Sequence, residues 1–275
     1  MRNAVAAGSL YPSDAGELKS AIMSLMNTAA VSQKEVGNAV AYVAPHSDYR
    51  YAGSVAAYTY KALSMNKDIN RIDTFVIVGP NQKGIGTRIA ISEDSWQTPL
   101  GDVENDKEFA EELIAMSVGM VPDEEGHRLE HSIEMQLPFL QHVVKRPKCC
   151  FISMLDQTED ASRAVAHDVD SVRKRLGKNI VMIAASDLDS NESDQVARGK
   201  DMPLIEKLMS FDTRGFYSEL NNSMDSASGF GPMAAVQQYA RMRKAKSGKL
   251  LKYATSADIT GNKDSVVGYA SVAFA

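Results

Sequence analysis

The alternation of apolar and polar positions along the chain predicts strands and helices in regular succession. Short runs of small or β-branched apolar residues, most of them bounded by turn residues, are typical of buried strands. These runs cover residues 39–44, 74–78, 88–92, 149–155, 180–185, 252–256 and 266–274. Apolar residues recur with helical spacing at 54–64, 106–117, 132–143, 161–176, 201–209 and 232–244. A further helix is expected to begin near Asp14, with Glu17 as its capping-box partner.

This succession defines the expected fold class. Strand and helix alternate almost throughout, which predicts an α/β fold with a largely parallel or mixed central sheet flanked by helices. The sequence contains no internal repeat, low-complexity tract or Pro/Ser-rich linker. We therefore expect one domain that spans residues 1–275.

Three of the predicted strands end in unusual polar segments. P-H-S-D-Y-R-Y occupies residues 45–51, G-P-N-Q residues 79–82, and S-D-L-D-S residues 186–190. Ligands of open α/β sheets bind at the carboxyl ends of strands, so all three segments are candidates for the rim of one pocket. Each is also compatible with an ordinary polar loop. The candidate pocket residues are His46, Asp48, Tyr51, Asn81, Gln82, Asp187, Asp189 and Ser190.

Two further segments carry candidate chemistry. Residues 226–232, S-A-S-G-F-G-P, include Ser228 and resemble a helix N-terminus, which either holds an anion or simply caps the helix. Residues 126–139 contain His127, Glu130, His131 and Glu134. The two glutamates are expected on one face of a helix. We expect His127 in a solvated loop, and His131 is a candidate to line a site.

Composition and charge argue against a nucleic-acid-binding protein and against a membrane protein. The chain has 275 residues, of which 44% are apolar and 24% charged, as in soluble globular proteins. Its 30 basic and 35 acidic residues give a net charge of -5, which argues against nucleic-acid binding. The apolar runs are too short to span a bilayer, and no signal peptide is indicated. Cys149 and Cys150 are adjacent and form neither a disulfide framework nor a zinc motif, which favours a cytoplasmic protein.

Several motifs, taken in order, resemble the MEMO family, of the AmmeMemoRadiSam system protein B type. They are A-A-G-S-L-Y-P at 6–12, P-H-S-D-Y-R-Y-A-G at 45–53, G-P-N-Q at 79–82, W-Q-T-P-L-G at 96–101, E-H-S-I-E-M-Q-L-P-F-L-Q at 130–141, and S-V-V-G-Y-A at 265–270. The resemblance spans nearly the whole chain. It implies a fold similar to that of class III extradiol dioxygenases, which use non-haem iron.

The resemblance also implies where a metal would be held. The MEMO family pocket draws three histidines and one cysteine from its motifs. In this sequence His46 is the only one of these ligands that is retained, whereas Gln82, Ser190 and Ser228 stand at the other three positions. Imidazole and thiolate bind iron, copper and zinc well, but amide and hydroxyl oxygens are weak, uncharged ligands. We therefore expect a family member without a metal cofactor.

This reasoning leaves several functions open. The favoured hypothesis is a metal-free protein that binds a small molecule or a protein partner, with a homo-oligomer as one form of partnership. The alternative is an enzyme that uses the same pocket, with His46, His131 and Asp187 as candidate catalytic residues. Asp48, Asp187 and Asp189 would then offer oxygen ligands for a divalent metal such as magnesium, manganese, calcium or iron. Dioxygenase chemistry is the least favoured hypothesis, since it needs the lost ligands.

Overall fold

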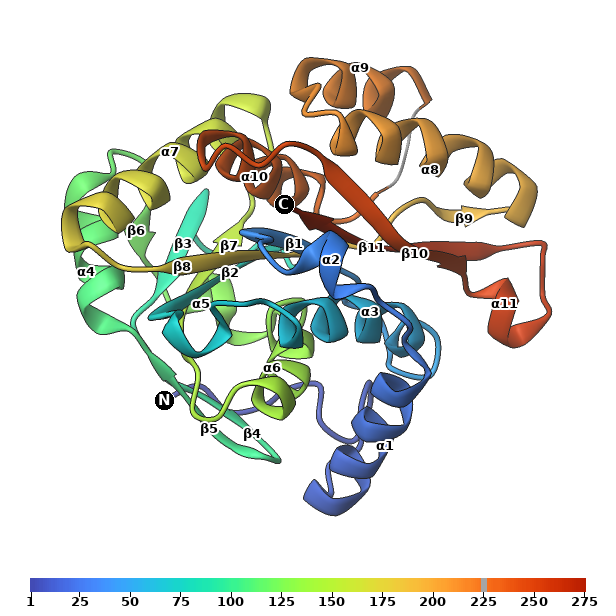
Figure 1. Cartoon of the computed structure of the whole chain (residues 1–275), viewed down its shortest axis with the longest axis horizontal. Coiled ribbons are helices and arrows are strands. Elements are labelled where there is room, and N and C mark those ends of the chain that lie inside the picture. Colours follow the sequence, from blue (N-terminus) through green and yellow to red (C-terminus); the bar gives the residue numbers. More distant parts are fainter. Residues whose placement is uncertain (224–226) are drawn as a thin grey trace.

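The central strands of the computed structural model run parallel, and the sheet becomes antiparallel toward both edges (Figure 1). The structure describes residues 1–223 and 227–275. Its parallel centre consists of four neighbouring strands in the order β1 (Ala41–Ala44), β8 (Ile180–Ala185), β2 (Thr74–Pro80) and β7 (Lys148–Met154). The predicted α/β class with a mixed sheet is confirmed.

Antiparallel strands extend the sheet at one edge. There β11 (Val266–Phe274) pairs with β1, and both β10 (Gly248–Thr255) and β9 (Ser190–Glu192) pair with β11. The bounds of β8 and β11 are those predicted from the sequence. β9 was not predicted, because three residues are too few to show a strand period.

The opposite edge is less regular. β3 (Ile89–Ser92) pairs antiparallel with β7, and β6 (Val121–Pro122) pairs with β3. A hairpin of β4 (Trp96–Thr98) and β5 (Gly101–Asn105) joins β7 through β5. Like β9, the strands β4, β5 and β6 were not predicted, since each is short and lacks a sustained alternation.

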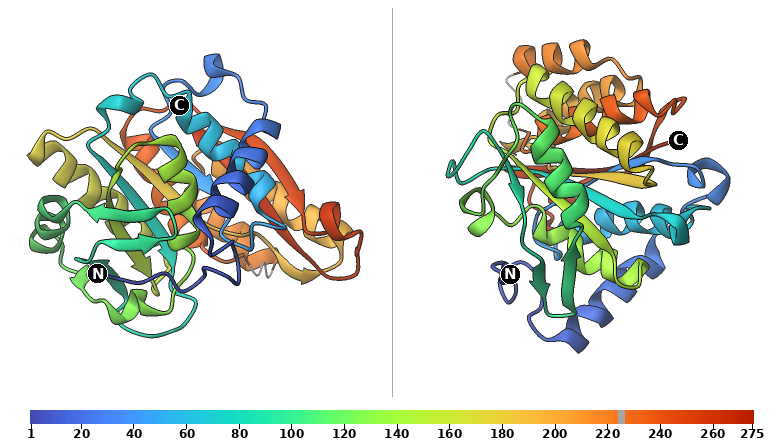
Figure 2. Two further views of the ribbon diagram at one scale, coloured as in Figure 1. Left: turned by 90° about the horizontal axis from the view of Figure 1, so that it is seen from below. Right: turned by 90° about the vertical axis from the view of Figure 1, so that its left-hand side faces the viewer.

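Helices cover both faces of the sheet (Figure 2). One face packs against α1 (Ala15–Thr28), α3 (Gly53–Ser64) and α6 (Leu137–Val143). The other packs against α4 (Lys107–Met116), α7 (Glu159–Leu176), α8 (Asp194–Met209), α9 (Thr213–Ser223) and α10 (Phe230–Met242). The short elements are α2 (Gln33–Val36), α5 (Glu125–Arg128), α11 (Ala257–Thr260) and the 3-10 turns η1 (Ile69–Arg71) and η2 (Glu134–Gln136).

The strand period divides the core into two layers. Successive side chains of a strand point to opposite faces. Cys149 accordingly belongs to the core beneath α1, α3 and α6, and Cys150 to the core beneath the other helices. Both thiols are free and buried, and burial raises the pKa of each. In the described part of the chain, no helix is both long and apolar enough to cross a lipid bilayer.

Helix ends agree with the sequence where side chains cap them. The Asp14 carboxylate accepts a hydrogen bond from the Glu17 backbone at 2.8 Å, as the predicted start of α1 requires. By contrast, α8 begins at Asp194 and not at the predicted residue 201. Its first turns are polar, and an ion pair between Asp194 and Arg198 at 3.0 Å supports them where apolar periodicity is lacking. The predicted helix at 132–143 is divided into η2 and α6.

His127 does not lie in a solvated loop, and that prediction is wrong. Its side chain is fully buried, its ring packs edge-on against Trp96, and Nε2 lies 3.1 Å from the Ala90 carbonyl oxygen. Burial lowers the pKa of His127 to about 4, so the imidazole is neutral near pH 7. His127 therefore helps to hold the structure together and does not face the solvent.

A buried ion pair ties the N-terminus to the turn that precedes α6. Arg2 Nη1 lies 2.7 Å from Glu134 Oε2, and the Glu134 carboxylate also accepts the backbone N–H groups of Val5 and Ala6 and the Tyr11 hydroxyl. The remaining guanidinium donors of Arg2 reach the carbonyl oxygens of His127 and Glu130. Both charges are thus satisfied by several hydrogen bonds, which offsets the cost of burying them.

Glu134→Gln should lower the free energy of unfolding by about 3–5 kcal/mol, because it leaves the Arg2 guanidinium buried without a counter-charge. Urea denaturation followed by circular dichroism measures this change. Glu125→Gln is the matched control, since Glu125 pairs with Arg128 at an exposed position and should cost less than about 1 kcal/mol. Equal effects of the two substitutions would contradict a structural role for the buried pair.

Candidate functional site

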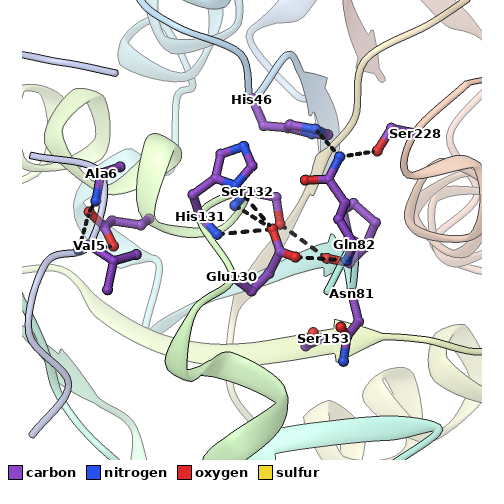
Figure 3. A network of polar contacts seen from close by, with 12 residues as sticks. Val5, Ala6, His46, Asn81, Gln82, Glu130, His131, Ser132, Ser153 and Ser228 are labelled. Atoms are coloured by element: carbon purple, nitrogen blue, oxygen red, sulfur yellow. Dashed lines mark hydrogen bonds and ion pairs between the residues drawn. The ribbon is translucent and has the colours of Figure 1, made fainter. Parts of the chain in front are cut away.

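The three predicted polar segments meet at one edge of the sheet. β1, β8 and β2 are adjacent and parallel, so their carboxyl ends lie side by side. His46 follows β1, Asp187 follows β8 and Gln82 follows β2. Figure 3 shows His46, Gln82 and Ser228 close together. The topology thus brings together residues from four distant parts of the chain.

Gln82 connects His46 to Ser228. Its amide nitrogen Nε2 lies 3.2 Å from His46 Nε2 and donates a hydrogen bond to Ser228 Oγ at 2.6 Å (Figure 3). These are three of the four positions at which the family resemblance implies metal ligands. Here they form hydrogen bonds with one another. The fourth, Ser190, lies in β9, where it is the pairing partner of Val267 in β11.

Asp187 holds the segment that carries His46. Its Oδ1 accepts the His46 backbone N–H at 2.9 Å, and its Oδ2 accepts the Ser47 hydroxyl at 2.5 Å. The same Oδ2 lies 3.5 Å from His46 Nε2. Since both oxygens are engaged, Asp187 orients the backbone and one side chain of this segment as well as facing the imidazole.

Two backbone hydrogen bonds to Asp187, which form an antiparallel β-bridge just after β8, position Ser228. The backbone N–H of Asp187 donates to the Ser228 carbonyl at 2.9 Å, and the Ser228 N–H returns a bond to the Asp187 carbonyl at 3.0 Å. Gly229 follows at φ 93°, and a Cβ there would lie 2.6 Å from the Ala185 carbonyl oxygen. Only glycine fits this approach. Ser226, at the start of the segment predicted to bind an anion or cap a helix, lies outside the described residues.

Glu130 organises the site, although we expected from the sequence only that it would share a helix face with Glu134. It lies outside any helix, before η2. The buried carboxylate accepts the backbone N–H groups of Gln82 at 2.7 Å, His131 at 2.9 Å and Ser132 at 3.0 Å (Figure 3). It thereby joins the loop after β2 to the turn before α6. Its place directly before His131 in the E-H-S motif was the signal available in the sequence.

His131 lies beside His46 with its ring nearly perpendicular, at a centroid separation of 5.7 Å. Burial lowers the pKa of His131, and the neighbouring His46 and Lys83 lower it further, whereas Glu130 and Asp187 raise it. The net direction is downward, which keeps the imidazole neutral near pH 7. A neutral imidazole has one nitrogen free to accept a proton.

A cavity of about 460 Å³ opens next to His131. Its lining is rich in hydroxyl groups and includes Ser47, Asp48, Tyr51, Ser256, Ser265 and Tyr269. Burial and the nearby Asp187 raise the pKa of Tyr269, so its phenol remains a hydrogen-bond donor. Ser47 and Tyr269 were not selected from the sequence, although Ser47 directly follows His46. Of the predicted residues, Asp48, Tyr51 and His131 line this cavity.

The other predicted polar residues have partners of their own. Asp48 forms an ion pair with Arg50 through two hydrogen bonds, with Nη2–Oδ2 and Nε–Oδ2 distances of 2.5 and 2.9 Å. Asn81 shapes the loop that follows it by bonding to the Ile85 carbonyl and the Gly84 N–H. Asp189 faces Lys200 of α8, with its Oδ2 3.7 Å from Nζ. Asp48, Asp187 and Asp189 therefore have different partners.

The described residues contain no group of three His, Cys, Asp or Glu side chains placed to hold a metal ion. Around His46 the polar neighbours are an amide, a hydroxyl and one carboxylate. What this arrangement offers chemically is two close imidazoles, a carboxylate that accepts from a serine hydroxyl, and an adjoining hydroxyl-rich cavity.

Comparison with known proteins places the chain in a family. A family model described as Memo-like protein matches residues 2–273. A MEMO1 family protein from Methanosarcina mazei is 36% identical over 99% of this chain and 98% of its own length. A MEMO1 family protein from Methanocaldococcus jannaschii is 36% identical over 98% of this chain and 98% of its own length. One from Sulfurisphaera tokodaii is 38% identical over 88% of this chain and 85% of its own length. This chain therefore belongs to the MEMO family.

Proposed function

We propose that this chain is a metal-free member of the MEMO family that binds a small molecule in the cavity beside His131. The observation that carries the proposal is the Gln82 amide, which lies between His46 and Ser228 and contacts both. His46, Gln82 and Ser228, the side chains that would have to converge on a metal, form hydrogen bonds with one another. The cavity next to them remains open to a ligand.

The chemistry of the donors supports the absence of a transition metal. Iron, copper and zinc select imidazole and thiolate ligands. Around His46 the corresponding positions hold the Gln82 amide and the Ser228 hydroxyl, which are neutral and weak ligands. His46, His131 and Asp187 lie near one another, but the described residues contain no three such side chains placed to hold a metal ion, and no step of the proposed function uses one.

The size and lining of the cavity support a small-molecule ligand. Sites for small molecules typically enclose about 300–1,000 Å³, and this cavity of about 460 Å³ lies in that range. The hydroxyls of Ser47, Ser256 and Ser265 are able to donate and accept hydrogen bonds, and Tyr51 and Tyr269 add aromatic surface. A protein partner would need a broader surface of about 800 Å². The geometry therefore favours a small molecule that has both apolar surface and groups able to form hydrogen bonds.

A second candidate function is acid–base catalysis in the same cavity. The observation that favours it is His131, which lines the cavity and has a lowered pKa, so it is available as a base near neutral pH. The Ser47 hydroxyl bonded to Asp187 is a second proton-transfer pair at the same wall. The oxygen-rich metal site expected as an alternative would have only Asp187 and His46 in contact, and it has correspondingly little support.

The absence of a transition metal is tested by metal analysis. Protein purified from cells grown with added iron, copper and zinc should contain far less than one equivalent of each. Gln82→His combined with Ser228→Cys supplies a second imidazole and a thiolate, and should raise metal binding at least tenfold. Near-stoichiometric metal in the unaltered protein, lost on His46→Ala, would refute the proposal.

Ligand binding in the cavity is tested with a substitution that fills part of the cavity. Ser265→Trp places an indole at the rim, whereas Lys263→Trp adds the same group two residues away at a position that does not line the cavity. Ligand-observed NMR with a library of polar fragments should give hits for the unaltered protein and Lys263→Trp, and lose most of them for Ser265→Trp. Equal hits for all three proteins, or none for any, would contradict a binding cavity here.

The acid–base candidate requires that His131 be neutral near pH 7. An NMR pH titration of its ring protons should give a midpoint below 6.5, because burial and His46 lower its pKa. Since the unfolded chain then binds the proton more tightly, His131 should also make folding less stable as pH falls below about 6.5. A midpoint at or above 6.5 would remove the support for His131 as a base.

A further inference from the structure

A second cavity, of about 590 Å³, is lined by residues of α7, α9 and α10 and of the segment between α8 and α9. These helices lie on the face of the sheet opposite α1, α3 and α6 (Figure 1). It shares no lining residue with the cavity beside His131. Three arginines line it, one from each helix: Arg163, Arg214 and Arg241. None of them takes part in the fold's core or in the site described above.

The positive charge of this cavity is only partly neutralised. Arg163 pairs with Asp160 one turn earlier in α7. Among the residues that the structure describes, no carboxylate pairs with Arg214 or Arg241. The Asp212 carboxylate at the rim is already bonded to the Gly215 N–H and to Lys207. Glu159 is the one remaining lining carboxylate, so positive charge exceeds negative charge.

A buried donor adds to these charges. The Gln238 amide nitrogen Nε2 is inaccessible to solvent and has no hydrogen-bond partner within the described ranges. Gln238 lies in α10 and lines the same cavity as the arginines. Buried amide donors nearly always find an acceptor, and an orphan of this kind requires an explanation. A rotation of the Gln238 side chain toward the cavity would bring this nitrogen within reach of an acceptor on a ligand.

The apolar part of the lining comes from Phe211 and Met242. Phe211 has φ 59°, in the left-handed region that a phenylalanine rarely adopts. Its ring packs at 5.7 Å from that of Phe274, which holds it at the junction between α8 and α9. This left-handed conformation is the usual end of a helix: Phe211 follows the C-cap of α8, and the Asp212 N–H donates to the Lys207 carbonyl at 3.1 Å. The cavity therefore combines cationic donors with an aromatic wall.

We propose that this cavity binds a small organic phosphate, with the phosphate group held by Arg214 and Arg241 and the organic part lying against Phe211. A phosphate monoester offers three acceptor oxygens and about two negative charges, which matches two guanidinium groups and the Gln238 amide. Guanidinium groups bind phosphate through paired hydrogen bonds. The volume of about 590 Å³ admits a molecule of nucleotide size.

The test uses AMP as the probe with the full-length protein. Isothermal titration should detect AMP binding, weaker binding of inorganic phosphate, and no binding of adenosine, since the phosphate carries most of the interaction. Arg214→Gln combined with Arg241→Gln should weaken AMP binding at least tenfold. The matched control is Arg71→Gln with Arg128→Gln, which makes the same change in net charge at exposed arginines and should leave AMP binding unchanged.

Three results would overturn the proposal. They are no AMP binding at millimolar concentration, equal loss of binding in both double variants, and unchanged binding in the Arg214 and Arg241 variant. Circular dichroism spectra of all proteins show whether each variant is folded. Ser265→Trp, which fills the other cavity, should bind AMP as the unaltered protein does. That comparison separates this site from the one beside His131.

Discussion

The buried ion pair between Arg2 and Glu134 is the interaction on which the geometry of the site depends. Glu134 gathers the N-terminal segment, and Arg2 in turn holds the carbonyl oxygen of Glu130 at 2.5 Å. The Glu130 side chain then fixes the backbone N–H of Gln82, whose amide reaches His46 and Ser228. A continuous series of hydrogen bonds therefore runs from residue 2 to the end of β1. At the end of this series, His46 Nδ1 is buried and has no hydrogen-bond partner among the described residues.

In this arrangement, backbone contacts hold the loops of the site in place, whereas side chains supply the groups that face His46. The backbone of residue 82 is held by Glu130, and the backbone of residue 228 by its bridge to Asp187. Neither contact involves the side chain that faces His46. Other side chains at residues 82 and 228 would therefore leave these backbone contacts in place. A scaffold built largely from backbone contacts explains how the chain matches the family over its whole length while offering amide and hydroxyl groups beside His46.

Sequence patterns predicted the parts of this structure that depend on local periodicity. Apolar runs located the central strands, and the Asp14 cap located the start of α1. The meeting of the three strand ends followed from parallel topology. His127 was misplaced because its burial depends on Trp96 and Ala90, which are distant in sequence. The E-H-S motif marked the segment of Glu130, but the role of this residue was missed because its partners are backbone N–H groups, which residue types do not reveal.

Among the described residues, Arg146, Arg214, Arg241 and Arg243 have no carboxylate partner, and two of these four line the same cavity. Acidic residues outnumber basic ones, 35 to 30, and several cationic side chains have more than one carboxylate or a shared one as partner. Asp106 pairs with Lys178, and Asp170 with both Arg173 and Lys174. In a chain with excess acid, chance would leave carboxylates unpaired more often than guanidinium groups. Arg214 and Arg241 instead line one cavity, each without a carboxylate partner among the described residues, beside a buried amide donor without an acceptor. A local excess of donors against the sign of the whole molecule is what a site for an anion requires.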